Sequence, residues 1–178
     1  MRLLEILTRE SRARDAPFVV IGGHAVIAHG YARQTFDLDL LVRDRDRAAW
    51  LEMLAALDYR VYHADEVFVQ LSPPSETLWP VDLMLVSDAT FEGIGADARD
   101  ADFGSVTARI PSLEHLLALK LHVLKDARPP REVKDLADVV QLVVANRLDA
   151  RADAFRRLCV KYGNPTLYER ILDALGRP

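Results

Sequence analysis

The order of apolar and polar positions predicts alternating helices and strands in the chain before Pro111. Apolar residues recur at helical spacing over residues 1–13, and short apolar runs bounded by Pro, Gly or charged residues follow. The expected strands are 18–21, 36–42, 59–63, 67–71, 78–86 and 105–110, and the expected helices are 1–13, 24–29 and 44–57, with a loop or ragged helix over 88–102.

After Pro111 the pattern changes to helices alone. Helices are expected over 112–125, 131–146, 150–162 and 166–175. The change is a shift in composition without a linker. We therefore expect an α/β (α+β) core over residues 1–110, with a mixed β-sheet flanked by helices, and a helical extension over 111–178 packed on that core.

Two carboxylates stand near the start of the second expected strand. Asp37 and Asp39 are two positions apart, so their side chains share one face of the strand. We expect their apolar neighbours to fill the core behind them: Phe36, Leu38 and Leu40. Adjacent carboxylates repel each other unless a cation lies between them, and hard oxygen ligands favour Mg²⁺ or Mn²⁺.

A third carboxylate, Asp82, lies in the expected strand 78–86. Val81, Leu83 and Leu85 share one face of that strand, and Asp82 lies on the other. Neighbouring strands are about 4.8 Å apart, so Asp82 would contact the same cation if the two strands are neighbours.

A glycine pair supplies the second half of the expected site. Gly22 and Gly23 end the first apolar run, where a backbone without side chains lets a ligand approach and the following helix offers free N–H groups to phosphate. Arg33, in the next loop, either contacts phosphate or pairs with Asp37. A phosphate cradle beside a carboxylate pair predicts a nucleoside triphosphate site.

The order Gly-Gly, helix, Arg, Asp-x-Asp resembles the signature of the DNA polymerase beta-like nucleotidyltransferase superfamily. Three sequence segments are most similar to AbiEii-type minimal nucleotidyltransferases of prokaryotes: Gly-Gly-His-Ala at 22–25, Arg-Gln-Thr at 33–35 and Asp-Leu-Asp-Leu at 37–40. This resemblance implies a metal-dependent enzyme that moves a nucleoside monophosphate from a triphosphate to an acceptor hydroxyl and releases pyrophosphate. It also implies that Asp82 is the third metal carboxylate and a general base.

The same resemblance implies a toxin–antitoxin setting, with a cognate toxin or antitoxin protein as partner and an RNA such as tRNA as acceptor. A small molecule, as in aminoglycoside-modifying nucleotidyltransferases, and a protein hydroxyl are rival acceptors. A rival of another class is a non-catalytic module that has this fold and binds a nucleotide or a partner protein.

A lysine interrupts the apolar stripe of the expected helix 112–125. Lys120 lies between Leu116 and Leu124, where a cation needs an anionic partner such as a triphosphate or a metal-site carboxylate, unless its side chain extends to the surface. With the later Lys134-Asp135 and Asp138 it resembles the C-terminal motif of AbiEii-like proteins. That resemblance implies a nucleotide or catalytic role for Lys120 and a site role for Asp135, which is otherwise a helix N-terminal charge.

On that second helix, Lys134 and Asp138 are expected to point outward, away from the buried face. At the start of the expected helix 24–29, directly after the glycine pair, His24 is a weaker candidate for a phosphate contact.

Composition narrows the classes of protein to which the chain can belong. The formal net charge of −4 gives no global basic footprint for nucleic acid, although a local groove can still be basic. Cys159, the one cysteine of 178 residues, excludes an internal disulfide framework and is expected in the core. No apolar run is long enough to span a bilayer, and the amphipathic first residues do not form a signal peptide. We therefore expect a cytoplasmic protein without a membrane partner.

Overall fold

A five-stranded mixed sheet forms the centre of the first of two units. The computed structural model describes residues 2–176, of which 2–28 and 33–112 form the first unit and 29–32 with 113–176 form the second. The first unit contains α1 (Arg2–Ala13), β1 (Phe18–Val20), α2 (Gly22–Ala28), β2 (Leu38–Arg43), the 3-10 turn η1 (Asp44–Asp46), α3 (Arg47–Ala55), β3 (Arg60–Ala64), β4 (Phe68–Ser72), β5 (Val81–Val86), α4 (Asp88–Ala96), β6 (Arg99–Asp102) and β7 (Thr107–Ile110).

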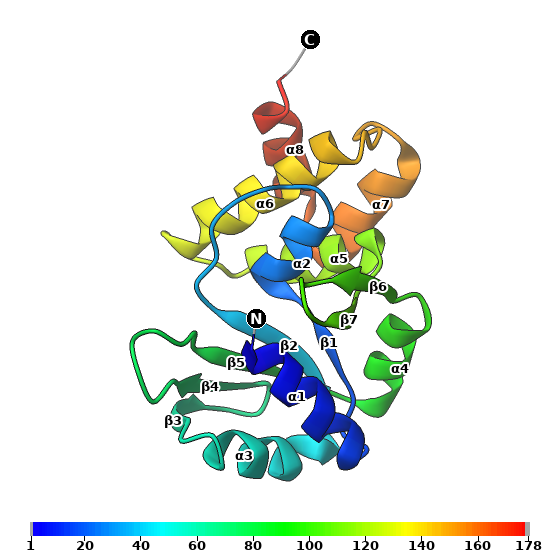
Figure 1. Ribbon diagram of the computed structural model, residues 1–178. Coiled ribbons are helices and arrows are strands. Elements are labelled where there is room, and N and C mark those ends of the chain that lie inside the picture. The colour runs from blue at the N-terminus through cyan, green and yellow to red at the C-terminus, as the bar shows by residue number, and fades with distance from the viewer. Residues whose placement is uncertain (1, 177–178) are drawn as a thin grey trace. The chain divides into compact units, whose positions relative to one another are not determined.

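The sheet has the strand order β1-β2-β5-β4-β3 (Figure 1). β2 and β5 run parallel, and every other neighbouring pair in it runs antiparallel. β6 and β7 form a second, two-stranded antiparallel sheet. This arrangement confirms the predicted α/β class with a mixed sheet and flanking helices.

The prediction of a loop or ragged helix over 88–102 was incomplete. The segment forms α4, whose first turn is capped by the Ser87 hydroxyl accepting from the backbone N–H of Thr90 at 3.2 Å, and then β6. The β6 sequence Arg-Asp-Ala-Asp has little intrinsic strand preference, and it becomes a strand through its pairing with β7. Residue 1 of the expected first helix lies outside the described residues.

Strand β5 has one apolar face, as its alternation predicts, whereas in β2 Leu41 is buried as well as Leu40. In β5, Val81, Leu83 and Leu85 are buried while Asp82 is half-buried on the other face. Phe36, however, is 68% exposed, so the expectation that it fills the core was wrong. β2 begins only at Leu38, and the period of two that assigns faces along a strand does not extend into the loop before it.

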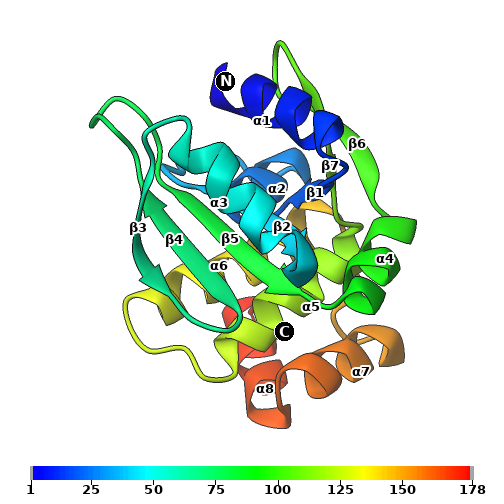
Figure 2. The ribbon, with the colours of Figure 1, turned by 90° about the horizontal axis from the view of Figure 1, so that it is seen from below.

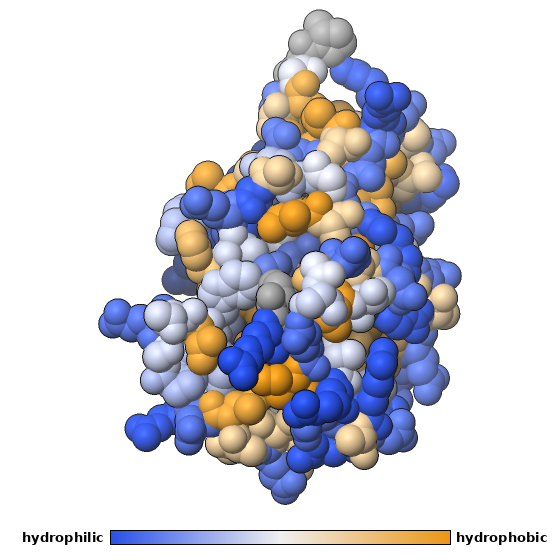
Figure 3. All heavy atoms as spheres, viewed as in Figure 1, coloured by the Kyte–Doolittle hydropathy of each residue, from blue (hydrophilic) through white to orange (hydrophobic). Residues whose placement is uncertain are grey.

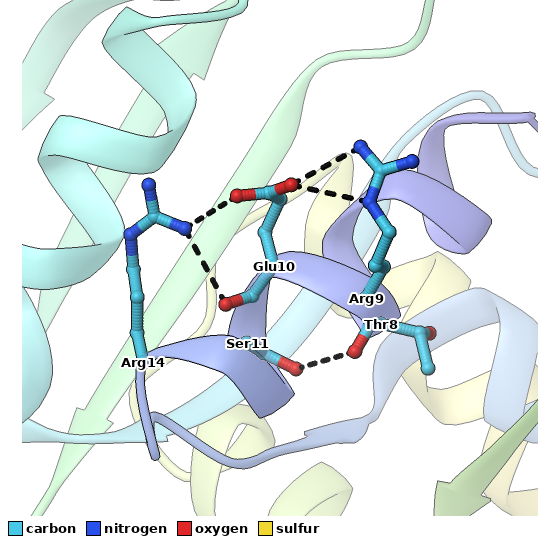
Figure 4. Close-up of polar contacts among 5 residues, drawn as sticks. All are labelled: Thr8, Arg9, Glu10, Ser11 and Arg14. Atoms are coloured by element: carbon cyan, nitrogen blue, oxygen red, sulfur yellow. Dashed lines mark hydrogen bonds and ion pairs between the residues drawn. The ribbon is translucent and has the colours of Figure 1, made fainter.

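Helix α1 lies beside α3 and carries an ion-pair cluster (Figure 4). Glu10 accepts from Arg9, with Nη2 at 3.1 Å, and from Arg14 on its other carboxylate oxygen. Hydrogen bonds from Arg14 and then Arg9 lower the pKa of Glu10. The cluster lies at the surface, where such pairs add little to stability.

Apolar and polar residues are interspersed on the face seen in Figure 3.

The second unit contains four α-helices within the described residues. They are α5 (Leu113–Leu124), α6 (Arg131–Ala145), α7 (Asp153–Tyr162) and α8 (Pro165–Ala174), and α5 contacts both α6 and α7. Asn146 at the end of α6 donates to the backbone oxygen of His29 at 2.9 Å and so holds residues 29–32 in this unit. Cys159 is fully buried, as expected, and burial raises its pKa to about 12.

The model gives one finding on membrane crossing. Among the helices of residues 2–176, none has both the length and the apolar composition that spanning a bilayer requires.

Truncating the core behind the carboxylates is expected to cost much more than truncating the sheet edge. Leu40 is fully buried, so Leu40→Ala should lower the free energy of unfolding by about 2–5 kcal/mol. Val61, 48% exposed on β3, should lose less than about 1 kcal/mol on the same truncation. Urea unfolding of both variants measures the difference. Equal losses would contradict the described burial.

Candidate active site

The three carboxylates predicted from the sequence lie together in the first unit. Asp39 on β2 and Asp82 on β5 are directly paired in the parallel register, and Asp37 precedes β2 by one residue. Asp39 and Asp82 are half-buried on the face opposite the apolar core. The Asp37 carboxylate accepts a hydrogen bond from the Thr35 hydroxyl at 2.6 Å. The loop before β2 therefore fixes Asp37, and strand pairing fixes the other two.

Gly22 lies against one of these carboxylates. Its φ of +59° is in the left-handed region, and a Cβ added there would lie 1.8 Å from Oδ2 of Asp39. The backbone N–H of Ile21 donates to the carbonyl oxygen of Asp39 at 3.0 Å, which ties the turn to β2. Any side chain at position 22 would displace the carboxylate.

Gly23 is confined by the loop that carries the predicted arginine. A Cβ at this position would lie 2.2 Å from the Thr35 hydroxyl and 3.1 Å from a guanidinium nitrogen of Arg33. The other guanidinium Nη of Arg33 donates to the carbonyl oxygen of Gln34 at 2.8 Å. The structure thus brings Gly22, Gly23 and Arg33 together with the carboxylates. Helix α2 begins at Gly22 itself and includes both glycines, whereas the sequence predicted a helix that begins at His24.

Gln70 is a site residue that the sequence analysis missed. Its amide Nε2 donates to Oδ2 of Asp82 at 2.7 Å, and the two residues are directly paired across β4 and β5. A glutamine on the polar side of an alternating strand carries no signal of its own. Its role becomes visible only when the register of the two strands is known.

His24 is buried beside this cluster rather than open to a ligand. It is 7% exposed, its ring centroid lies 4.9 Å from that of Trp79, and its Nε2 has no hydrogen-bond partner. Burial lowers the pKa of His24, Asp37 opposes that effect and Arg33 adds to it. The imidazole is therefore held in its neutral form, which suits packing better than phosphate binding.

The carboxylates fit a divalent cation that a nucleotide also binds. Within residues 2–176, no three His, Cys, Asp or Glu side chains are placed to hold a metal ion by themselves. Mg²⁺ is usually held by one or two carboxylates together with substrate phosphates and water. The carboxylates of Asp39 and Asp82, two residues paired in strand register beside the turn at Gly22, match that smaller donor set.

The predicted residues Lys120 and Asp135 lie in the second unit, where they form a buried ion cluster. Lys120 Nζ lies 2.6 Å from Asp135 Oδ1 and 2.8 Å from Asp138 Oδ2. Asp138 is fully buried, so the expectation that it points outward was wrong. It follows Asp135 by three residues, nearly one helical turn, and both carboxylates face α5.

Two opposing effects act on the Lys120 ammonium. Burial acts to lower its pKa, but the charges and hydrogen bonds of Asp135 and Asp138 outweigh burial and raise it above 10.5. The stabilisation from a raised lysine pKa is complete below the unfolded-state value and is lost as the pH rises through the folded-state value. Lys120 is therefore charged at neutral pH. The anionic partner that the sequence required is supplied by α6.

Comparison with known proteins assigns the family. The model of the family described as "Nucleotidyl transferase AbiEii toxin, Type IV TA system" matches residues 72–177, more than half of the chain. The chain belongs to the AbiEii nucleotidyltransferase family. The match includes Asp82, Lys120 and Asp135, whereas the glycine turn and Asp37 with Asp39 precede it. The predicted family and the predicted enzyme class are both confirmed.

Solved structures share the fold of this AbiEii-family chain. ANT(2'')-Ia in complex with adenylyl-2''-tobramycin has a TM-score of 0.68 at 17% identity, covering 90% of this chain and 95% of its own. The lincosamide antibiotic adenylyltransferase LnuA, bound to lincomycin, has a TM-score of 0.57 at 16% identity, covering 79% and 93%. An antigenic nucleotidyltransferase-like protein from Paracoccidioides brasiliensis has a TM-score of 0.57 at 13% identity, covering 98% and 90%. No curated protein sequence matched the chain.

The AbiEii-family turn is expected to reject a side chain at Gly22. Gly22→Ala should destabilise the protein by about 1–2 kcal/mol through its left-handed backbone, and it should also displace Asp39. Gly93→Ala is the matched control, because a Cβ there meets nothing within 4 Å in α4, and it should stabilise by about 0.4–1 kcal/mol. Thermal unfolding and nucleotide binding measure the two effects. Unchanged nucleotide binding by Gly22→Ala would show that the turn is structural only.

Removing the cation of the second unit is expected to destabilise the protein strongly. Lys120→Met leaves Asp135 and Asp138 facing each other in a buried site, which should cost about 3–5 kcal/mol in urea unfolding at neutral pH. The triple variant Lys120→Met, Asp135→Leu, Asp138→Leu should regain most of that loss, since it leaves no unpaired charge in the buried cluster and Arg131, which also pairs with Asp135, is exposed to solvent. A triple variant as unstable as the single one would argue against the ion cluster as the cause.

Proposed function

We propose that the first unit transfers a nucleoside monophosphate from a nucleoside triphosphate to an acceptor hydroxyl, with Mg²⁺ or Mn²⁺ as cofactor. The observation that carries this proposal is the direct pairing of Asp39 with Asp82 beside the turn at Gly22. Two carboxylates on adjacent strands next to a backbone turn without side chains are the donor set that a metal–triphosphate complex requires.

The phosphates of the donor nucleotide would lie over the Gly22–Gly23 turn. Neither residue has a side chain, Gly22 lies against Asp39, and the guanidinium of Arg33 lies at the same turn. A planar guanidinium donates two parallel hydrogen bonds to phosphate oxygens. Arg33 would therefore hold the polyphosphate and stabilise the charge that develops on the leaving pyrophosphate.

Asp37, Asp39 and Asp82 would hold the divalent cations through their carboxylate oxygens. A cation bound there supplies Lewis-acid stabilisation of the entering and leaving oxygens. Asp82, fixed by Gln70, would also orient the acceptor hydroxyl and accept its proton. The hydroxyl oxygen then forms a bond to the α-phosphorus, the bond from that phosphorus to the bridging oxygen breaks, and pyrophosphate leaves.

The roles of Lys120 and Asp135 in nucleotide binding stay a prediction from the family resemblance. Both carry the charges that the motif requires, and each is paired within the second unit. A triphosphate would compete with Asp135 and Asp138 for the same ammonium.

The family places the activity in a toxin setting, and we propose that the acceptor is an RNA such as tRNA, with a cognate antitoxin as partner. A small-molecule acceptor is the second candidate within the same chemistry. It is supported by the fold shared with ANT(2'')-Ia and LnuA, whose structures contain an adenylylated and a bound antibiotic respectively. A protein hydroxyl is the third acceptor class.

A non-catalytic nucleotide- or partner-binding role is the alternative outside enzyme chemistry. It predicts metal-dependent nucleotide binding without pyrophosphate release. The presence of all three carboxylates favours turnover.

Replacing one paired carboxylate is expected to abolish transfer while preserving the fold. Asp39→Asn keeps the shape of the side chain but weakens cation binding, so transfer should fall by roughly 10²-fold or more. Stability should change by less than about 1 kcal/mol. The measurement is label transferred from each α-labelled nucleoside triphosphate, with Mg²⁺, into the RNA, protein and small-molecule fractions of a cell extract.

Asp97→Asn is the matched control, because Asp97 is an exposed carboxylate at the end of α4 and should transfer as well as the unmodified protein. Transfer retained by Asp39→Asn would refute the carboxylate mechanism. Nucleotide binding without transfer by the unmodified protein would favour the binding-module role.

A further inference from the structure

A polar row crosses the sheet from the glycine turn toward its far edge. Asp39, Asp82 and Gln70 are paired in register on β2, β5 and β4, so their side chains project from one face. Gly22 contacts the row at the Asp39 end, and Gln70 forms its other end. The site therefore runs along the sheet from the Gly22 end to the Gln70 end.

A bulge lies beyond Gln70, in the edge strand β3. Val61 pairs with Leu71 and His63 pairs with Gln70, which leaves Tyr62 as an extra residue beside the Gln70 position. Bulges of this kind redirect a side chain and are common next to active sites. Figure 2 shows β3 at the edge of the sheet beside β4, and all five of its residues are exposed.

Tyr62 lies within electrostatic range of the carboxylates. Partial burial raises the pKa of its phenol, and the charges of Asp82 and then Asp37 raise it further. The ring is nevertheless 60% exposed. An aromatic ring that is open to solvent and close to a catalytic row offers a face to a planar ligand.

The geometry of phosphoryl transfer assigns this end of the row to the acceptor. The entering and leaving oxygens lie roughly in line on opposite sides of the phosphorus. If pyrophosphate leaves on the Gly22 side, the acceptor hydroxyl enters from the Gln70 side. Tyr62 is the exposed aromatic residue of β3, and Arg60, also exposed, begins the same strand.

We propose that the acceptor enters over β4 and β3, where Tyr62 stacks on a nucleobase of an RNA end and Gln70 positions Asp82. This inference rests on the proposed transfer function and adds the acceptor side of the site. A nucleobase suits the position because each base has a flat face for Tyr62, and the guanidinium of Arg60 suits the adjoining phosphate. The Gln70 amide donates to Oδ2 of Asp82 and so positions this carboxylate for the acceptor hydroxyl.

Three variants test the stacking role of Tyr62. The probe is total small RNA with free 3′ hydroxyls, used with α-labelled nucleoside triphosphate and Mg²⁺. Tyr62→Ala should raise KM for the RNA by roughly 5- to 100-fold, the range expected for one stacked base, and leave KM for the nucleotide within about twofold. Tyr62→Phe keeps the ring and should behave as the unmodified protein. Val61→Ala, a neighbour on the same strand that pairs with the buried Leu71, is the matched control and should have no effect on either KM.

The variant Gln70→Leu tests whether the Gln70 amide positions the carboxylate of Asp82. Leu has a similar volume without the amide, so kcat should fall by roughly tenfold or more while both KM values and the thermal midpoint stay unchanged. A fall in thermal midpoint equal to that of a core truncation, with kcat unchanged, would show a structural role and overturn this part of the proposal.

The outcomes separate this inference from the proposed function. If the protein labels RNA and Tyr62→Ala has an unchanged KM, the acceptor side is wrong while the function stands. If only the small-molecule fraction is labelled, the proposal that Tyr62 stacks on a nucleobase is overturned. If no label is transferred, the proposed function fails. The stacking role of Tyr62 is then tested separately by the fluorescence anisotropy of labelled RNA. Weaker RNA binding by Tyr62→Ala supports stacking, and equal binding or no binding overturns it.

Discussion

The parallel pairing of β2 with β5 is the constraint on which the site depends. Leu38 and Leu40 on one strand and Val81 and Leu83 on the other bury their side chains on the same face. Because successive side chains of a strand point to opposite faces, this burial places the alternate positions on the opposite face. A slip of one residue would bring a carboxylate into the core, so the hydrophobic effect itself enforces the meeting of Asp39 and Asp82.

The cost of holding carboxylates side by side is met differently in the two units. In the first, the Gln70 amide and the Thr35 hydroxyl each donate to one carboxylate, which offsets part of the repulsion. In the second, Lys120 neutralises Asp135 and Asp138 directly. A buried charge cluster of that kind contributes specificity of helix pairing more than net stability.

The shared fold of antibiotic adenylyltransferases and this AbiEii-family chain shows why fold alone does not name the acceptor. The donor half of the site uses backbone and carboxylates that any nucleoside triphosphate requires. In the proposed arrangement, discrimination among acceptors comes from the side chains beyond Asp82, on β4 and β3. An exposed edge strand is free to change its side chains without disturbing the core, so acceptor choice can change there while the chemistry stays the same.

Local periodicity determined much of this protein from sequence: the helices after Pro111, the alternation in β5 and the turn at Gly22–Gly23. Tertiary structure decided what local periodicity cannot contain. The register of β4, β5 and β3 placed Gln70 on Asp82 and left Tyr62 at a bulge, and the pairing of α5 with α6 buried Asp138. Phe36 is exposed because the strand begins two residues later than its sequence suggests. A period assigns faces within one element, whereas partners are chosen by contacts between elements far apart in the chain.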